Sequence, residues 1–354
     1  MENNPNNTPE NSATPEINKE VIAQPEKPNV DLSELSINKD VHEIRDVYEK
    51  TKNEVQKMIV GNDEVIKLLL AGMFTGGHVL MEGAPGVAKT MIAKLISQCF
   101  NIDFKRIQFT PDLMPSDLIG VNVFNLQKSE FTFKKGPLFS NLVLIDEINR
   151  SPAKTQAALF EAMEEKQITV DGISYKLDIP FFVIATQNPI DQEGTYKLPE
   201  AQLDRFLFKL KVNYPELKSE VEILKRFQGD FSQKNTQKID HVLDPKKIEK
   251  YLQIIEKVHI KEELLHYIAA IVHQTRNNGN LHLGASPRAS MSIMKTAKAI
   301  AAINGRDFVS PDDIQNVCYP VLNHRIILSP EKEMEGVTVD AVIKEIIQNI
   351  EVPR

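Results

Sequence analysis

Residues 83–90 read Gly83-Ala84-Pro85-Gly86-Val87-Ala88-Lys89-Thr90. An apolar run beginning at His78 precedes this stretch, and a helix-like stretch beginning at Met91 follows it. A buried strand, a turn of small residues and a helix start together present backbone N–H groups and a positive dipole end to a polyphosphate. In such a loop Lys89 reaches the β and γ phosphates, and the Thr90 hydroxyl ligates Mg²⁺. The stretch therefore predicts a nucleotide site, with an ordinary strand-to-helix turn as the alternative.

The loop departs from the strict phosphate-binding pattern at Ala88, where that pattern has glycine. Alanine carries only a small Cβ and is tolerated where φ stays negative. We therefore expect a negative φ at Ala88 and a working loop.

An apolar strand further along the chain ends in two adjacent carboxylates. Residues 142–145 are Leu-Val-Leu-Ile, and Asp146 and Glu147 follow them. Because parallel strands end at the same edge of a sheet, we expect these acids beside the phosphate loop. Asp146 would hold the water shell of the magnesium ion, and Glu147 would activate the water that attacks the γ phosphate. The pair predicts hydrolysis of the nucleotide, whereas a strand that merely ends in solvated acids is the alternative.

The composition limits size, partners and compartment. The chain has 354 residues, of which 42% are hydrophobic, enough for one large core and a smaller second one. A net charge of −7 argues against nucleic acid as a general partner, since such binding depends on excess Lys and Arg. Cys99 and Cys318 lie far apart, which suits a reducing compartment. No run approaches the roughly 18 apolar residues of a membrane span, so we expect a cytoplasmic protein without stable membrane insertion.

Periodicity divides the chain into three parts. Residues 1–38 are rich in Asn, Pro, Glu and Thr, lack aromatic residues and predict a disordered tail. Residues 39–214 alternate strand-like and helix-like runs, which predicts an α/β core with a parallel five-stranded sheet. Residues 215–354 are helical by period and predict a smaller all-α domain. The strand-like runs of the core are 78–82, 106–109, 142–146, 181–186 and 206–212.

Two short alternating runs within residues 121–135 predict a β-hairpin insert in the core. Phe124, Phe131 and Phe133 lie on these runs. They either pack within the hairpin or form a tip that contacts a partner, and the sequence leaves both interpretations open.

Two further polar positions complete a hydrolysis site. The apolar run 181–186 is followed by Asn188, which can orient the attacking water or contact the γ phosphate; an Asn-Pro turn is the alternative. Arg205 opens the last strand-like run of the core. In a single chain it would form a surface ion pair, whereas in a ring it could reach the γ phosphate of a neighbour as an arginine finger.

These motifs together resemble the MoxR family of AAA+ ATPases, and the resemblance covers roughly residues 41–354. Alanine before the lysine is usual in that family. The corresponding segments are 83–90 (Walker A), 142–150 (Walker B), 185–189 (sensor 1), 198–206 (arginine finger) and 284–289 (sensor 2).

The resemblance implies a P-loop AAA+ core of three αβα layers, followed by an all-α lid domain. It implies ATP and Mg²⁺ as cofactors and hydrolysis between the subunits of a homo-oligomer, usually a hexamer. It further implies chaperone-like action on a protein client, commonly with a von Willebrand factor A domain protein as partner. The hairpin near 121–135 would be the helix-2 insert close to the ring pore.

Three further residues, Arg288, Val60 and Gly61, are assigned to the nucleotide. Ser286 and Pro287 predict a helix start, where the positive charge of Arg288 opposes the dipole. We therefore expect Arg288 to meet a nucleotide bound between lid and core. The resemblance puts Val60 and Gly61, by position alone, on the adenine side.

Three more residues are assigned around the predicted site. Met91, directly after the loop, is counted among the nucleotide-contacting residues. Arg150 either forms a structural ion pair or reaches across a subunit boundary. Gln108, at the end of the second strand, is expected to couple the substrate state to Glu147.

Three functions remain open from the sequence. The first is an ATP-driven machine that remodels or assembles proteins, which the motifs and the acidic balance favour. The second is a motor or loader that acts on nucleic acid, for which Lys128, Lys134 and Lys135 of the hairpin are the candidate contacts. The third is a chelatase-type ATPase subunit that depends on a separate effector.

Overall fold

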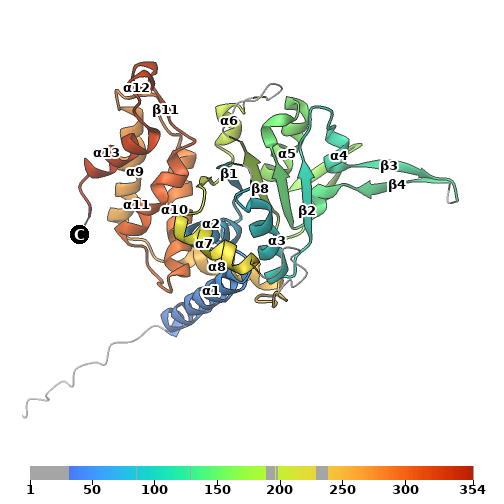
Figure 1. Ribbon diagram of the computed structural model, residues 1–354, viewed down its shortest axis with the longest axis horizontal. Coiled ribbons are helices and arrows are strands. Elements are labelled where there is room, and N and C mark those ends of the chain that lie inside the picture. The colour runs from blue at the N-terminus through green and yellow to red at the C-terminus, as the bar shows by residue number, and fades with distance from the viewer. Residues whose placement is uncertain are drawn as a thin grey trace, which may run out of the picture.

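The computed structural model describes residues 32–84, 86–127, 129–188, 196, 198–228 and 238–353, and it has an α/β core beside a helical domain (Figure 1). The core is built on a five-stranded sheet in which every neighbouring pair is parallel. The sheet has the order β2-β5-β8-β1-β9, with β1 (Val79–Gly83), β2 (Phe104–Gln108), β5 (Leu142–Asp146), β8 (Phe182–Gln187) and β9 (Phe208–Val212). The five runs expected from the sequence are these strands, so the predicted parallel α/β sheet is confirmed.

Helices cover both faces of this sheet because its strands are apolar on both sides. Leu142 and Leu144 of β5 pack into one hydrophobic cluster, and Val143 and Ile145 pack into the other. Alternate residues of a strand point to opposite faces, so a continuous apolar run fills two layers. The first cluster includes α2 (Asp63–Phe74) and α3 (Lys89–Cys99), and the second includes α5 (Ala153–Glu165). Short helical segments of the core are α4 (Pro115–Ile119), η1 (Pro137–Phe139), η2 (Ile148–Arg150) and α6 (Glu200–Leu203).

The first helix, α1 (Leu32–Gln56), begins earlier than the sequence predicts. Its start lies within the segment 1–38 that was expected to be disordered, which corrects that boundary; residues 1–31 lie outside the described residues. The packed part of the helix, where Val41 and Ile44 are fully buried, forms first, and the helix extends back from it because each added residue gains one hydrogen bond. Lys250 Nζ bonds Asp40 at 2.9 Å, which ties α1 to the helical domain.

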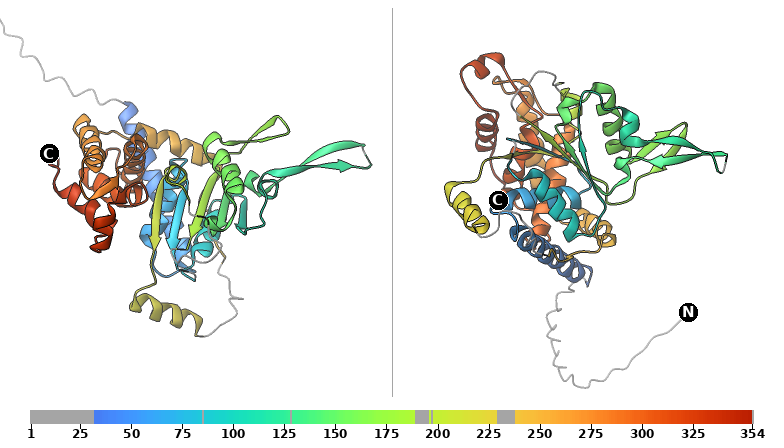
Figure 2. Two further views of the ribbon diagram at one scale, coloured as in Figure 1. Left: turned by 90° about the horizontal axis from the view of Figure 1, so that it is seen from above. Right: turned by 45° about the vertical axis from the view of Figure 1, so that its right-hand side comes forward.

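Two β-hairpins project from the same end of the core (Figure 2). The predicted one is β3 (Gly120–Asn125) paired with β4 (Glu130–Lys135). The second, β6 (Gln167–Val170) with β7 (Ile173–Lys176), was not predicted. The rings of Phe133 and Tyr175 stack at 4.6 Å between them.

The structure shows packing between two of the hairpin phenylalanines, and contact of the tip with a partner stays a prediction. Phe124 and Phe131 pack edge to face across the hairpin with ring centroids 5.1 Å apart. Phe131 nevertheless remains 71% exposed, so the end of the hairpin presents apolar surface.

The C-terminal part is helical, with one correction to the expected all-α domain. The strands β10 (Leu281–Leu283) and β11 (Ile327–Leu328) form a small antiparallel pair, too short to leave a periodic signal in the sequence. Within the described part of the chain, none of the helices has the length and apolar character to cross a membrane. The helices are α7 (Leu217–Phe227), α8 (Lys246–Lys257), α9 (Glu262–Arg276), α10 (Pro287–Ile303), α11 (Pro311–Leu322), α12 (Pro330–Met334) and α13 (Val339–Gln348).

Candidate active site

The predicted phosphate loop connects the end of β1 to the start of α3. Gly83 lies so close to β9 that a Cβ there would come within 2.4 Å of the carbonyl oxygen of Val212. Gly86 has a φ of +85°, where glycine is favoured. The helix α3 begins at Lys89 without a side-chain cap, so its first backbone N–H groups are suited to bind an anion. Pro85 lies outside the described residues.

Ala88 contradicts the expectation of a negative φ. It has φ 61° and ψ 17°, a left-handed conformation that costs a residue with a Cβ roughly 1–2 kcal/mol. The closure of the loop onto the helix start sets this angle, whatever the residue type. The conformation is held in place because Val87 is buried and the carbonyl of Ala88 accepts from Ile92 N at 3.0 Å.

Lys89 folds back over the loop that carries it. Its Nζ donates to the carbonyl oxygen of Gly83 at 2.6 Å. Burial is the largest influence and lowers the pKa of Lys89, whereas Asp146, Glu147 and Glu82 act in the opposite direction. The ammonium group is therefore partly desolvated and lies close to the acids at the ends of the strands.

Asp146 is held by two side chains that the sequence analysis missed. Arg106 Nε donates to Asp146 Oδ2 at 2.5 Å, and Thr186 Oγ1 donates to Asp146 Oδ1 at 3.3 Å. Thr186 Oγ1 also accepts from the backbone N–H of Glu147 at 3.0 Å. No local signal marks Arg106, because its role follows from the pairing of β2 with β5. Thr186 could have been found, since it ends an apolar strand beside Asn188.

Glu147 leaves the strand through a left-handed turn with φ 57°. This turn directs its carboxylate away from that of Asp146. Gln108 Nε2 donates to Glu147 Oε2 at 3.3 Å, so the two residues are in contact, and the coupling assigned to them stays a prediction. Arg150 Nη1 lies 2.9 Å from the same oxygen, so this chain supplies the ion pair that was one of the two options for Arg150. A non-glycine residue in this conformation is typical of functional sites.

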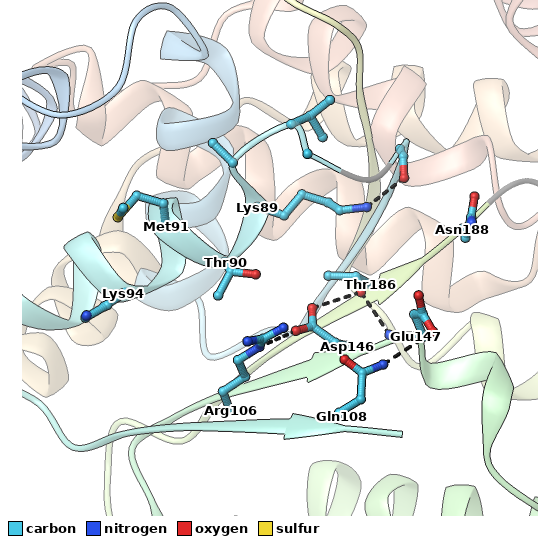
Figure 3. A pocket seen from close by; sticks show the side chains of 14 residues that line it. Lys89, Thr90, Met91, Lys94, Arg106, Gln108, Asp146, Glu147, Thr186 and Asn188 are labelled. Carbon is cyan, nitrogen blue, oxygen red and sulfur yellow. Dashed lines mark hydrogen bonds and ion pairs between the residues drawn. The ribbon is translucent and has the colours of Figure 1, made fainter. Parts of the chain in front are cut away.

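Apart from Arg150, these side chains line one cavity of about 530 Å³ (Figure 3). Gly83 and residues 86–91 line it, together with Asp146, Glu147 and Asn188. In Figure 3, Lys89 and Thr90 lie across the cavity from the two acids. The structure thus brings most of the predicted site residues together.

Three predicted contacts do not line this cavity: Ala84, Val60 and Gly61. Gly61 lies beside α7, where a Cβ would be 3.8 Å from Ser219 Oγ. The adenine-side assignment of Val60 and Gly61 stays a prediction.

Arg205 and Arg288 lie in a different cavity, of about 320 Å³, which shares no lining residue with the first. Both are ion-paired with Glu164 of α5: Arg205 through Nη1, and Arg288 through Nη2 at 2.9 Å. Ser286 is the N-cap of α10 and accepts from Arg288 N at 3.2 Å, as predicted. Arg288 lies between lid and core, but it lines a cavity apart from the phosphate loop, so its contact with a nucleotide stays a prediction.

The two cavities lie at opposite edges of the sheet, one at the amino ends of the strands and the other at their carboxyl ends. His78, directly before β1, lines the arginine cavity, and Gly83, which ends β1, lines the phosphate-loop cavity. The five residues of β1 separate them by about 16 Å at roughly 3.3 Å per residue. The arginines of one chain are thus separated from the phosphate loop of the same chain by the length of strand β1.

Comparison with known proteins relates the chain to described families. Residues 78–208 match the family described as ATPase family associated with various cellular activities (AAA). Residues 273–346 match the AAA lid domain.

Individual relatives cover most of the chain. It is 43% identical over 304 residues to the uncharacterized protein YeaC of Bacillus subtilis, covering 86% of this chain and 94% of that protein. It is 38% identical over 310 residues to the chaperone MoxR1 of Mycobacterium tuberculosis, covering 85% of this chain and 81% of that protein. The crystal structure of a "putative ATPase" from Cytophaga hutchinsonii is 42% identical, with a TM-score of 0.84 over 92% of this chain and 100% of that one.

Proposed function

The chain belongs to the MoxR family of AAA+ ATPases and hydrolyses ATP, and from this we propose that its active sites are shared between adjacent copies in a homo-oligomeric ring, a hexamer. One observation carries the proposal: the arginine cavity and the phosphate-loop cavity lie at opposite edges of one sheet. In a head-to-tail ring, one edge of each copy faces the other edge of its neighbour.

The phosphate loop binds the triphosphate of ATP. Backbone N–H groups at the start of α3 donate to the phosphate oxygens, and Lys89 exchanges the carbonyl of Gly83 for the β and γ phosphates. This exchange restores a charged partner to a partly buried ammonium group.

Mg²⁺ fits the donor set of this cavity. The Thr90 hydroxyl and the Asp146 carboxylate both line it, and oxygen ligands are those that Mg²⁺ prefers. When bound, the ion would neutralise charge on the phosphates. Arg106 and Thr186 hold the Asp146 carboxylate in a fixed orientation toward the cavity.

Glu147 acts as the general base. Its carboxylate takes the proton of the attacking water, and Asn188, on the same cavity wall, orients that water. Gln108 and Arg150 bond the same oxygen, Oε2, and so fix the orientation of the carboxylate. Loss of a positioned base typically lowers turnover by about 10²- to 10⁴-fold.

Arg205 and Arg288 complete the site of the neighbouring copy. Both guanidinium groups would lie against the γ phosphate of the adjacent subunit and stabilise the charge that develops in the transition state. Arg205 is the arginine finger, and Arg288 acts with it across the same boundary.

A mixing experiment tests this division. Arg205→Ala subunits keep the phosphate loop, and Lys89→Ala subunits keep the arginines, so each alone should lose ATPase activity by about 10³-fold or more. A mixture should regain activity, because some interfaces pair an intact loop with an intact finger. Subunit exchange is verified with labelled copies. An Arg205→Ala variant that stays active alone, with no gain on mixing, would reject the shared site.

The work driven by hydrolysis is the remodelling of partner proteins, in line with the similarity to the chaperone MoxR1. The β3–β4 hairpin supports a protein client over nucleic acid, because it exposes Val121, Val123 and Phe124 together with Leu126 and Phe131. A von Willebrand factor A domain protein is the proposed partner.

A trapped form identifies the client class. Glu147→Gln subunits should bind ATP without turning it over and retain their partner in a pull-down. Recovery of nucleic acid, or ATPase stimulation by DNA that is lost at high salt, would favour the motor or loader instead.

The compartment proposed is the cytoplasm, since Cys99 and Cys318 are free, buried thiols.

A further inference from the structure

Glu164 joins two arginines that come from different domains. It lies in the last turn of α5, in the core. Its Oε2 pairs with Arg205, which lies just before β9, and its Oε1 accepts from Arg288 Nη2, at the start of lid helix α10, at 2.9 Å. One carboxylate thus uses a separate oxygen for each guanidinium group.

The charges around this carboxylate explain why it is needed. The cavity is also lined by Lys166, Lys295 and Arg325. Together with Arg205 and Arg288, these make five cationic side chains around it. Like charges this close repel one another, and without an anion between them the two arginines would separate.

The other carboxylate of the cavity is already engaged. Asp204 Oδ1 accepts from the buried Arg325 at 2.7 Å, and Asp204 Oδ2 accepts from Ser286 Oγ at 2.9 Å. These bonds join the segment that carries Arg205 to the lid. Glu164 is therefore the carboxylate among the described lining residues that pairs with Arg205 and Arg288.

The pairing leaves both arginines able to bind a further anion. A guanidinium group has five N–H donors, and the contact with Glu164 engages one nitrogen of each group. Glu164 is itself partly exposed at 37%, so a phosphate could approach from solvent beside it. The carboxylate aligns the two groups without occupying all of their donors.

We propose that Glu164 is a positioning residue that holds Arg205 and Arg288 together as a two-pronged clamp for the γ phosphate of the neighbouring subunit. The inference rests on the proposed function, in which these arginines act across the subunit boundary. It adds that their joint placement depends on a carboxylate of their own chain. Glu164 touches no nucleotide and acts through the two guanidinium groups.

The first test measures steady-state ATPase activity of Glu164→Ala. Misplacement of catalytic groups by about 1 Å can lower turnover by about 10²-fold, so we expect kcat to fall by about 10- to 100-fold with KM for ATP unchanged. Glu164→Gln keeps one acceptor oxygen and should fall between wild type and Glu164→Ala. Glu161→Ala is the matched control, because Glu161 is exposed one turn earlier on α5 and should behave as wild type.

The second test assigns the defect to a side of the interface. Glu164→Ala subunits keep an intact phosphate loop, so mixing them with Lys89→Ala subunits should restore activity, as Arg205→Ala subunits do. A mixture of Glu164→Ala with Arg205→Ala should show no gain, because both lack a working clamp. Each variant is first compared with Glu161→Ala for thermal midpoint and for oligomer size by sedimentation.

These outcomes separate the inference from the proposal beneath it. If Arg205→Ala and Lys89→Ala fail to complement one another although they exchange, the shared site itself is wrong. If they complement but Glu164→Ala does not complement Lys89→Ala, Glu164 serves assembly or its own site and the inference is overturned. Wild-type or higher activity of Glu164→Ala alone would also overturn it, since the carboxylate would then be idle or a competitor of the phosphate.

Discussion

Replacing Ala88 by glycine should stabilise the protein, because the structure puts a Cβ-bearing residue at φ 61°. Relief of the left-handed conformation contributes about 1–2 kcal/mol to the folded state. Glycine also loses more backbone entropy on folding, which offsets about 0.4–1 kcal/mol of this gain. The expected net change is an increase of about 1 kcal/mol in the free energy of unfolding.

A second Ala-to-Gly change isolates the strain. Ala157 is exposed on α5, where a helical φ suits alanine, so Ala157→Gly should lose about 1 kcal/mol. Both variants carry the same unfolded-state term, and the difference between them reports the conformation of the native residue. The sign of the effect should therefore be opposite at the two positions.

The assay is urea unfolding of the nucleotide-free protein, because bound ATP would add its own stabilisation. Equal slopes of free energy against urea would show that the same surface unfolds in each variant. The reasoning is refuted if Ala88→Gly loses as much stability as Ala157→Gly, since the backbone at Ala88 would then not be strained.

Further predictions concern chemistry, pH and packing. Lys89→Ala should abolish ATP binding measured by calorimetry, whereas Glu147→Gln should bind ATP normally and turn over about 10²-fold or more slowly; equal loss of binding would contradict the division of roles. His78 is buried, and burial lowers its pKa to about 4. As pH falls from about 6.5 toward 4, His78 is therefore protonated first in the unfolded chain. The contribution of His78 to the free energy of unfolding, measured with urea, should accordingly fall by up to about 3 kcal/mol over that window and stay constant above it. A free energy of unfolding that does not change with pH would contradict the buried neutral ring. Ile44→Ala should destabilise the protein by about 2–5 kcal/mol in the same assay, because Ile44 is fully buried in the core cluster; a loss below about 1 kcal/mol would show that α1 is not part of the folded unit.

The strands and the acidic end of the site could be predicted because their signals are local. Leu142 to Ile145 form an unbroken apolar run, which a sheet covered on both faces requires, and the acids follow directly. Parallel strands end together, so Asp146 and Glu147 had to lie near the loop after β1. One local signal was overlooked: Asp171-Gly172, both with positive φ, forms the tight turn of the unpredicted second hairpin.

The sequence does not reveal features that distant segments of the chain decide. The φ of Ala88 follows from how β1 and α3 are joined, which residue preference does not reveal. The place of Arg288 depends on how the lid packs on the core, since Arg325 bonds the carbonyls of Leu207 and Phe206. A buried guanidinium group that satisfies several backbone oxygens fixes this junction, and a sequence pattern around Arg325 does not indicate it.

The direction of the strands explains why the candidate catalytic groups divide between two cavities. At the carboxyl ends of β1, β5 and β8 the chain turns into the phosphate loop, the acidic pair and the approach to Asn188. At the opposite edge, the residues that lead into β1 and β9 meet the end of α5 and the lid, where the arginines gather. Arg205 lies just before β9 and Arg288 lies at the start of lid helix α10, both in a cavity at the opposite ends of the strands from the phosphate loop. No side-chain rotation within one chain could therefore bring the two sets together. In the proposed ring, a head-to-tail contact between copies would join the two edges directly, and repetition of that contact around an axis would give every loop a pair of arginines.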